Sequence, residues 1–381
     1  MKPGKHKKAI AILADLPVWT IRGNEQLRPP GHYATWLEPL LPAFEAHGDL
    51  DIHWITFSKY IGQSQVQKVY GQTVHILPRR RKMLSMVCGY IPEILSVRGV
   101  LKSIQPDLVH AWGSEDVYGL AGAFSGIPKR LFTLQGCLKE YLRLLGGSWL
   151  FRLQAFYETP AIRHYAAGTA ESPAARDLMQ AIHPSMSIQL VDYGVHPDFF
   201  AAEWNPSPTP EIVFVGGISK RKGILDIAKV AGAKEFAHIR FRIIGEGDLL
   251  GVLKSDSSPN IEWLGKCDRQ SVIRHLSRAW CLLMPTYSDT GPTVVKEARV
   301  IGLPVITTTG AGAACYIENA HSGYVIEPGN LKAIADSIAR ICKSRDHCMR
   351  MGRHHWEQTR HALHPSVTAS EFVQIYQSMF S

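Results

Sequence analysis

The chain has 381 residues, of which 45% are hydrophobic and 20% are charged, close to the average for a soluble globular protein. This composition excludes a mainly disordered chain, a collagen and a coiled coil, and no apolar run reaches the length of a transmembrane helix. The formal net charge of +9 favours anionic partners, such as phosphorylated small molecules or an acidic lipid surface. We expect no nucleic-acid partner, because no zinc-finger, RNP or GXXG pattern accompanies the positive charge.

The cysteine pattern and the N-terminal sequence bear on the cellular compartment. The seven cysteines are scattered and form no CxxC pair, which predicts neither a disulfide framework nor a zinc site. The basic start is followed by a short apolar run, 9–14, which ends at Asp15 and lacks a small-residue cleavage pattern. We interpret this run as a first buried strand rather than a signal peptide, and expect a cytoplasmic protein.

In chain order, the first half predicts an alternation of short apolar strands and amphipathic helices. The expected strands are 9–14, 51–56, 74–77, 108–111, 131–134, 164–167 and 188–191. The expected helices are 33–47, 91–105, 117–125, 149–157 and 173–182.

The second half carries the same alternation more clearly. The expected strands are 211–216, 241–245, 261–265, 280–285, 304–307 and 324–326. The expected helices are 223–235, 248–254, 268–278, 292–301 and 330–343, and a last helix over 366–381 has one apolar stripe. Buried strands that alternate with helices are typical of a parallel sheet covered on both faces.

Three prolines in the segment 204–210 predict a linker, so we expect an α/β protein with two doubly wound, Rossmann-like domains that face a cleft. The predicted boundaries are 1–203 for the first domain and 204–361 for the second. The final segment, 362–381, is expected to cross back and pack on the first domain.

The segment 285–298 offers the clearest candidate binding site. A strand ends at Pro285, a loop holds Asp289, and Pro292 suits the first position of a helix. Free N–H groups at a helix start bind anions, so a diphosphate fits here, and Glu297 is near enough to accept hydrogen bonds from sugar hydroxyls. The alternative is an ordinary strand–loop–helix with surface acids. The further candidates for donor binding in this loop are Thr290, Gly291 and Thr293.

A second candidate is the basic loop after the strand 211–216. Gly216 and Gly217 allow backbone to approach a ligand closely, and three cations follow within four residues: Lys220, Arg221 and Lys222. Lys222 could reach a phosphate, although an ordinary basic loop is the alternative. Gly245 belongs to a lone GxG turn without a third glycine in place, which argues against classical NAD binding. We expect no cofactor.

The order and spacing of these motifs resemble the family 4 glycosyltransferases, the "glycosyl transferases group 1" domain of the GT-B fold. The resemblance covers about 211–343 and includes Lys222-Gly223, Ile243-Ile-Gly-Glu-Gly247, Gly265, Asp289…Glu297 and Gly302-Leu-Pro-Val305. The first half matches only in outline, through Gly31 before a helix and Asp107-Leu-Val-His110.

The resemblance implies a retaining glycosyltransferase that uses a nucleotide-diphosphate sugar, with UDP or GDP as the nucleotide. Because the sequence shows no carboxylate cluster that would hold a metal, we expect metal independence. The family's first acid falls on Asp289 and would contact the donor sugar, and its second falls on Glu297 and would contact the ribose. Its lysine falls on Lys222 and would neutralise the diphosphate. The usual arginine after the first glycine is replaced by Gly217.

On the first domain, the resemblance places Gln135 where many relatives carry a histidine at a strand end. Glutamine can hydrogen-bond a sugar hydroxyl, but it cannot be a general base near neutral pH. His110 is a further catalytic candidate at another strand end, and buried packing is its alternative.

The expected function is therefore sugar transfer to an acceptor hydroxyl in polysaccharide, lipid-linked glycan or glycoconjugate synthesis. Two alternatives stay open, a catalytically impaired GT-B binding protein and a nucleotide-sugar epimerase. The basic residues Lys5, Lys7 and Lys8 and the run 79–82 also predict reversible peripheral attachment to an anionic membrane on its inner face.

Overall fold

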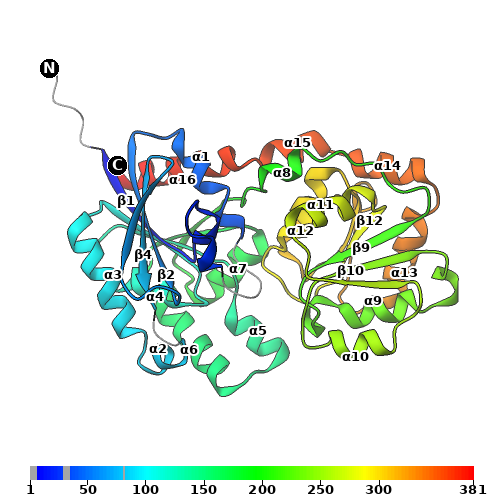
Figure 1. The fold of residues 1–381 in the computed structure, drawn as a ribbon, viewed down its shortest axis with the longest axis horizontal. Coiled ribbons are helices and arrows are strands. Elements are labelled where there is room, and N and C mark those ends of the chain that lie inside the picture. The colour runs from blue at the N-terminus through cyan, green and yellow to red at the C-terminus, as the bar shows by residue number, and fades with distance from the viewer. Residues whose placement is uncertain (1–6, 29–34, 80–81) are drawn as a thin grey trace. The chain divides into compact units, whose positions relative to one another are not determined.

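The computed structural model describes residues 7–28, 35–79 and 82–381, and its contacts divide the chain into two compact units. The first unit holds the residues up to Gly194 together with Pro365–Ser381, and the second holds Val195–His364. Each unit contains one α/β sheet (Figure 1). The fold is GT-B, as predicted.

The sheet of the first unit has the order β3-β4-β2-β1-β5-β6-β7-β8. Its pairs are parallel except β3–β4, which is antiparallel. The strands are β1 Lys8–Leu13, β2 Leu50–Ser58, β3 Gln65–Val69, β4 Gln72–Pro78, β5 Leu108–Trp112, β6 Arg130–Thr133, β7 Ala167–Ala170 and β8 Ser187–Leu190.

Helices cover both faces of this sheet, and side-chain alternation along β1 shows how the core is divided. Ile10 and Ile12 face one apolar cluster, whereas Ala11 and Leu13 face another, as the two-residue period of a strand requires. The helices are α1 Leu40–Glu45, α2 Lys82–Val87, α3 Ile91–Ile104, α4 Val117–Ala123, α5 Leu138–Leu145, α6 Trp149–Arg163, α7 Pro173–Ile182 and α16 Pro365–Phe380, with short 3₁₀ turns η1 Val18–Thr20, η2 Glu25–Leu27 and η3 Thr35–Leu37.

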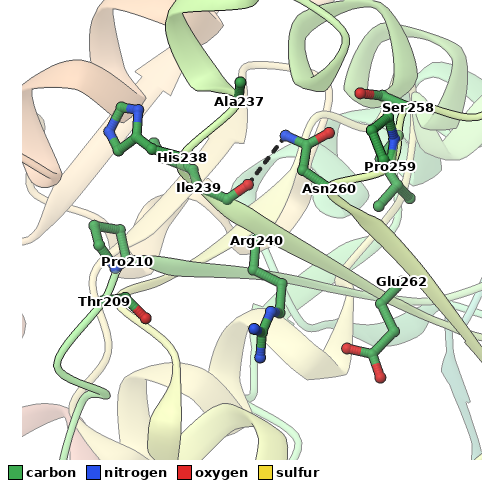
Figure 2. Close-up of a pocket in the computed structure, with 11 residues that line it drawn as sticks. Thr209, Pro210, Ala237, His238, Ile239, Arg240, Ser258, Pro259, Asn260 and Glu262 are labelled. Atoms are coloured by element: carbon green, nitrogen blue, oxygen red, sulfur yellow. Dashed lines mark hydrogen bonds between the residues drawn. The ribbon is translucent and has the colours of Figure 1, made fainter.

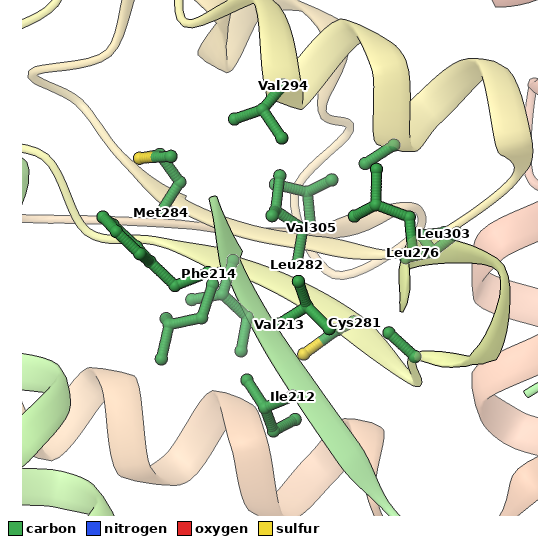
Figure 3. Close-up of a cluster of buried hydrophobic side chains, with 14 of the residues drawn as sticks. Ile212, Val213, Phe214, Leu276, Cys281, Leu282, Met284, Val294, Leu303 and Val305 are labelled. Atoms are coloured by element: carbon green, nitrogen blue, oxygen red, sulfur yellow. The ribbon is translucent and has the colours of Figure 1, made fainter. Parts of the chain in front are cut away.

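The second unit is a fully parallel sheet of order β11-β10-β9-β12-β13-β14. Its strands β9 and β12 lie within one buried apolar cluster, in which Phe214, Leu282 and Met284 pack with Val294 of α12 (Figure 3). The strands are β9 Glu211–Val215, β10 Arg240–Ile244, β11 Ile261–Gly265, β12 Cys281–Met284, β13 Val305–Thr308 and β14 Gly323–Ile326.

The helices of the second unit begin at the residue types that satisfy free N–H groups. Asp268, Asn330 and Ser344 each accept a hydrogen bond at the start of α11, α13 and α14. The helices are α8 Pro197–Phe200, α9 Ile224–Ala231, α10 Leu250–Ser255, α11 Arg269–Arg278, α12 Thr293–Ile301, α13 Leu331–Ile341, α14 Arg345–Arg353 and α15 Trp356–Ala362, with 3₁₀ turns η4 Lys220–Lys222, η5 Lys234–Phe236 and η6 Gly312–Tyr316.

The predicted linker at 204–210 is wrong, because this segment packs within the second unit. The indole N–H of Trp204 donates to Ala279 O at 2.9 Å, and the backbone N–H groups of Asn205 and Ser207 donate to Ser277 O and Arg278 O. The proline-rich sequence is therefore held by the end of α11, and the change between units lies nine residues before the predicted boundary, at Gly194–Val195.

The C-terminal helix α16 belongs to the first unit, although the residues before it, Val195–His364, belong to the second. Phe372 and Tyr376 are fully buried in the first unit's core, and α16 packs against α1. In addition, the Thr368 hydroxyl donates to Asp192 O at 2.7 Å. The apolar stripe predicted from the sequence is thus the buried face of this helix.

Candidate active site

The basic loop and the acidic loop emerge side by side from the second sheet. The strand order reverses between β9 and β12, which are neighbours, and the loops 216–222 and 285–292 follow these two strands. In open α/β sheets the carboxyl ends of the strands at such a reversal form the usual ligand site. The topology therefore brings together the two segments that the sequence singled out.

A glycine lets the two loops touch. Gly223 has a φ of +74°, and a Cβ built on it would lie 2.1 Å from Pro285 O. Next to it, the backbone N–H of Tyr287 donates to Arg221 O at 2.8 Å, and the Thr286 hydroxyl donates to the same oxygen at 3.0 Å. These contacts fix the basic turn η4 against the start of the acidic loop.

Lys222, Arg221 and Asp289 form an ion cluster between the loops. The Lys222 ammonium is ion-paired with Asp289 Oδ2, and Arg221 Nη1 lies 3.4 Å from the same oxygen while it donates to Ser288 O at 2.7 Å. The backbone N–H of Gly291 donates to Asp289 Oδ1 at 3.2 Å. Both carboxylate oxygens of Asp289 are therefore engaged by the protein.

The electrostatics of this cluster favour a charged Asp289. Burial disfavours the carboxylate, but the positive charges of Lys222 and Arg221 and the hydrogen bonds from Lys222 and Gly291 outweigh it and hold the pKa of Asp289 below its usual value. Two cations thus share one anion, which leaves the cluster with a net positive charge. Such a site attracts a phosphate group.

The start of α12 offers further donors. Pro292 is the N-cap residue, and the backbone N–H groups of Thr293 and Val294 donate to no acceptor among the described residues. The N–H of Gly291, just before the helix, is not available in the same way, because it donates to Asp289 Oδ1. Two N–H groups of the first helical turn, rather than the whole loop, are therefore available to an anion.

Glu297 lies on α12, one turn further along. Its side chain is half-buried, and its carboxyl accepts no hydrogen bond from the described residues. Burial raises the pKa of Glu297 to about 7, although the positive charges of Arg269 and Lys296 act in the opposite direction. Arg269 begins α11 and was not predicted as part of the site, because an arginine at a helix start carries no signal of its own. A desolvated carboxyl without a hydrogen-bond donor is suited to receive ligand hydroxyls.

The glycine positions serve close backbone packing between loops. A Cβ on Gly245 would lie 1.9 Å from Gly216 O, so the turn after β10 presses against the loop after β9. Gly265 has a φ of +65° and accepts a hydrogen bond from the Gly245 N–H at 2.8 Å. In contrast, a Cβ on Gly217 would meet nothing closer than Glu246 O at 4.0 Å, so space does not require glycine there.

Two further donor-site candidates differ in exposure. Lys220 is exposed at the start of η4, whereas Thr290 is buried in the acidic loop. Of these neighbouring cations of the basic loop, Arg221 lies near the Asp289 carboxylate, whereas no ion pair joins Lys220 to it.

On the first unit, Gln135 follows β6 and lies beside Glu115, an acid that was not among the predicted site residues. A Cβ on Gly113 would lie 2.6 Å from Glu115 Oε2 and 2.8 Å from Gln135 Oε1, so both side chains crowd the same glycine. Burial and the charge of Glu158 raise the pKa of Glu115 to about 7 against the opposing effect of nearby backbone N–H groups. Glu115 Oε2 is buried and accepts no hydrogen bond from the described residues. The sequence signal for Glu115 was its position after β5, next to Asp116.

His110 is not an active-site residue in this structure. It lies in the middle of β5 with no exposed surface, and its ring nitrogens are 2.7 Å from the Tyr376 hydroxyl and 2.6 Å from the Thr133 hydroxyl. Burial lowers the pKa of His110 to about 3, so the imidazole is neutral. Its role is to anchor α16 in the core, which is the packing alternative considered above. The predicted glycine loop at Gly31 lies outside the described residues.

A metal-ligand cluster and a surface hollow lie on other parts of the second unit. Among the described residues, Glu318, His354 and His355 place ligand atoms within 4.8 Å of one another on the surface. A hollow of about 620 Å³ opens beside Pro210, Arg240 and Asn260 (Figure 2). These residues precede or begin β9, β10 and β11, so the hollow lies at the amino ends of the strands, opposite to the ion cluster.

Comparison with known proteins identifies the domain that carries this site. Residues 197–356 match the family described as glycosyl transferases group 1. Residues 197–356 are therefore similar to a group 1 glycosyltransferase domain. The matched region includes the ion cluster of Lys222 and Asp289 as well as Glu297, so the sequence resemblance is confirmed at the level of the family.

Individual relatives are distant but extend over both units. The amylovoran biosynthesis glycosyltransferase AmsK of Erwinia amylovora is 23% identical over 59% of this chain and 60% of its own length. The UDP-Gal:alpha-D-GlcNAc-diphosphoundecaprenol alpha-1,3-galactosyltransferase of Escherichia coli is 20% identical over 73% of this chain and 84% of its own. The chain spans 36% to 60% of the first curated relatives that it matches. Among solved structures, the sucrose-phosphate synthase of Thermosynechococcus elongatus superposes with a TM-score of 0.79 at 15% identity, over 98% of this chain and 99% of its own.

Proposed function

We propose that the protein is a retaining glycosyltransferase that moves a sugar from a nucleoside-diphosphate donor to a hydroxyl of a glycan or lipid-linked acceptor. The observation that carries the proposal is the ion cluster of Lys222, Arg221 and Asp289 at the strand-order reversal of a group 1 domain. Relatives whose names describe polysaccharide synthesis and a UDP-galactose donor support it.

In the proposed donor complex, the diphosphate lies against Lys222 and Arg221 and against the N–H groups of Thr293 and Val294. During transfer, the acceptor oxygen bonds to the anomeric carbon while the bond from that carbon to the diphosphate oxygen breaks, and the acceptor hydroxyl passes its proton to the departing diphosphate oxygen. Negative charge then builds up on the leaving diphosphate, and preorganised cations and N–H groups stabilise it without reorganisation. We propose that the two side-chain cations do this without a divalent metal.

The carboxylates have different proposed roles. Glu297 accepts hydrogen bonds from the ribose hydroxyls of the nucleotide, because its carboxyl has no donor from the described protein. Asp289, in contrast, already accepts hydrogen bonds from Lys222, Arg221 and the Gly291 N–H through its two carboxylate oxygens. We therefore propose that Asp289 positions the cations, rather than contacting the donor sugar as the resemblance implied. UDP and GDP are the proposed nucleotides.

On the first unit, Gln135 and Glu115 are proposed to contact the acceptor. Gln135 supplies a neutral hydrogen-bonding group and Glu115 supplies a carboxyl with an elevated pKa. An acceptor carried on a lipid would bring the protein to an anionic membrane surface.

Product analysis with UDP- and GDP-sugars tests the proposal against its alternatives. The protein should release nucleoside diphosphate, and the first sugar product should keep the anomeric configuration of the donor, with or without a chelator. An isomerised nucleotide sugar would indicate an epimerase, and binding without any release would indicate an inactive binding protein. An inverted product would contradict the retaining mechanism.

A further inference from the structure

The first unit exposes apolar side chains on four of its helices. On α2, Met83, Leu84 and Val87 are 59%, 51% and 58% exposed, while Ser85 and Met86 between them are buried. Nine of the sixteen exposed large apolar side chains in the described chain lie on α2, α3, α5 and α6. We call the exposed apolar residues of these four helices the apolar helical face.

The long helix α6 contributes the largest side chains. Trp149 and Phe156 are 62% and 67% exposed, and they lie seven residues apart with the exposed Arg152 between them. Seven residues is close to two helical turns, so the three side chains form one stripe. The opposite side of α6 is buried through Ala155, Glu158 and Ile162.

Contacts between the helices show that the elements that carry these exposed side chains are neighbours. The Tyr157 hydroxyl donates to Met86 O at 2.9 Å, and the Tyr157 ring lies 5.7 Å from the rings of both Tyr90 and Phe156. Helix α6 therefore joins the end of α2 and the start of α3, where Ile91 is exposed. Helix α5 also packs against α6 (Figure 1).

The acids on these helices are withdrawn from the surface. Glu93 is buried and accepts a hydrogen bond from Ser85, and Glu158 is buried and accepts from the backbone N–H groups of Leu138 and Lys139 at the start of α5. Glu140 is ion-paired with Arg143. Among the described side chains of the four helices, the exposed charges without an acidic partner are therefore positive: Arg98, Lys102, Lys139, Arg152 and Arg163.

We propose that the apolar helical face docks on the anionic headgroup layer of a lipid bilayer, with its aliphatic and aromatic side chains at the acyl boundary. Exposed Trp, Phe and Leu beside Lys and Arg are the composition of interfacial helices, and clustered apolar surface of this kind marks an interaction site. The exposed lysines and arginines of the same four helices favour anionic lipid over a neutral surface. Among the described helices, none is both long and apolar enough to span the bilayer, so the contact is peripheral.

The apolar helical face differs from the basic runs that the sequence suggested as the membrane contact, of which the structure describes only a part. Lys8 is ion-paired with Asp107 at 2.7 Å, and Arg79 is paired through both terminal nitrogens with Asp116 and is largely buried. Neither cation is available to a lipid headgroup without losing its partner. Lys5 and residues 80–81 lie outside the described residues.

Co-sedimentation of the full chain with vesicles tests the proposal. The wild type should sediment with vesicles of phosphatidylcholine and phosphatidylglycerol, and less with phosphatidylcholine alone. Salt should weaken binding only in part, because it screens the cations but not the apolar contact. The double variant Trp149→Ser, Phe156→Ser should lose about tenfold or more in partitioning, because it removes two aromatic side chains from the interface.

Val252→Ser is the matched control, because Val252 is 70% exposed on α10 of the second unit and lies outside the apolar helical face. It should bind vesicles like the wild type. Circular dichroism and nucleoside diphosphate binding of both variants verify that they are folded. The inference does not rest on the proposed function, and these two measurements distinguish a failure of membrane binding from a failure of donor binding. Failure of the wild type to bind either vesicle, or equal binding by the double variant, overturns the proposal. The proposal is also overturned if the wild type forms a concentration-dependent dimer that the double variant does not form, and the wild type does not bind vesicles.

Discussion

Lys222 is the residue on which the proposed chemistry depends most. Replacing Lys222 with alanine removes the cation nearest to Asp289 and should lower kcat by about 10²–10³-fold, equivalent to about 2.7–4 kcal/mol for one preorganised electrostatic group. Stability should change little, because Arg221 and the Gly291 N–H still hold Asp289. Steady-state kinetics measure the effect.

Lys229→Ala is the matched control, since Lys229 is an exposed lysine on the following helix α9. It should behave like the wild type in both kcat and thermal unfolding. A wild-type kcat for Lys222→Ala would mean that the leaving group is stabilised elsewhere.

Glu297 gives the site a pH dependence with a definite sign. Because burial raises the pKa of Glu297 to about 7, the carboxylate that would accept ribose hydroxyls forms only as the pH rises through that value. Nucleoside diphosphate affinity should therefore increase between about pH 6 and about pH 8 by roughly tenfold, the range for a charge-assisted hydrogen bond.

Calorimetry of Glu297→Gln under the same conditions provides the control, because it shares the titration of the ligand itself. The variant should lose the extra pH dependence, and an unchanged pH profile would show that Glu297 does not contact the nucleotide.

The effect of Glu297 on the stability of the fold has the opposite dependence on pH. The folded protein binds this proton more tightly than the unfolded chain, so the contribution of Glu297 to stability falls as the pH rises from about 4.5 to about 7.

Individual site residues could be predicted from the sequence where the backbone topology dictates their place. Lys222 and Asp289 follow two strands, and a doubly wound order makes those strands neighbours. His110 was wrong because its partner Tyr376 is 266 positions away, and the sequence gives no sign that α16 covers that face of β5. The ion pair between Lys222 and Asp289 was likewise not predictable from the spacing of the two residues in the sequence.

At the scale of elements, the turn between β9 and α9 depends on Gly223. Gly223→Ala should lower both stability and donor affinity, because the new Cβ would lie 2.1 Å from Pro285 O and the residue keeps a φ of +74°. The cost in unfolding free energy should be about 1–3 kcal/mol, as for other strained backbone positions.

The matched variant is Gly251→Ala on α10, where a Cβ meets nothing within 4 Å. It should be neutral or stabilising by about 0.5–1 kcal/mol, because alanine is the better helix former. Urea unfolding of both variants measures the difference. Equal stability of the two would show that the loops around Gly223 and Pro285 are not closely packed.

Helix α16 should stabilise the first unit although it follows the second in sequence. Phe372→Ala removes a fully buried ring and should cost about 3–5 kcal/mol, whereas Gln374→Ala on the exposed side should stay within about 0.5 kcal/mol. Hydrogen exchange should then show lost protection in β1 and β5. Loss confined to the strands of the second unit would contradict this assignment.

Most elements could be predicted from their apolar pattern, although the helices α2, α5, α8, α14 and α15 were not. Three further differences have physical causes. The antiparallel strand β3, Gln-Val-Gln-Lys-Val, was missed because it is a polar edge strand without a buried run. The strand predicted at 164–167 was placed too early, and the structure has β7 at Ala167–Ala170. Helix α6 continues past Pro160 to Arg163, since Ala161 and Ile162 are buried by packing that the local sequence does not reveal.

At the scale of the whole molecule, the two units carry separate parts of the proposed function. The second unit holds the ion cluster and Glu297, and its family match covers 197–356. The first unit holds Gln135, Glu115 and the apolar helical face, and acceptor choice is proposed to depend on it.

Titration calorimetry of the wild type with UDP, GDP and ADP tests the central claim most directly, that the second unit binds a nucleoside diphosphate at Lys222 and Glu297. We predict that one of the three binds and that Lys222→Ala and Glu297→Ala each weaken it by about tenfold or more, as expected for lost charge-assisted hydrogen bonds. Binding that both variants retain in full, or no binding of any of the three by the wild type, would contradict the account.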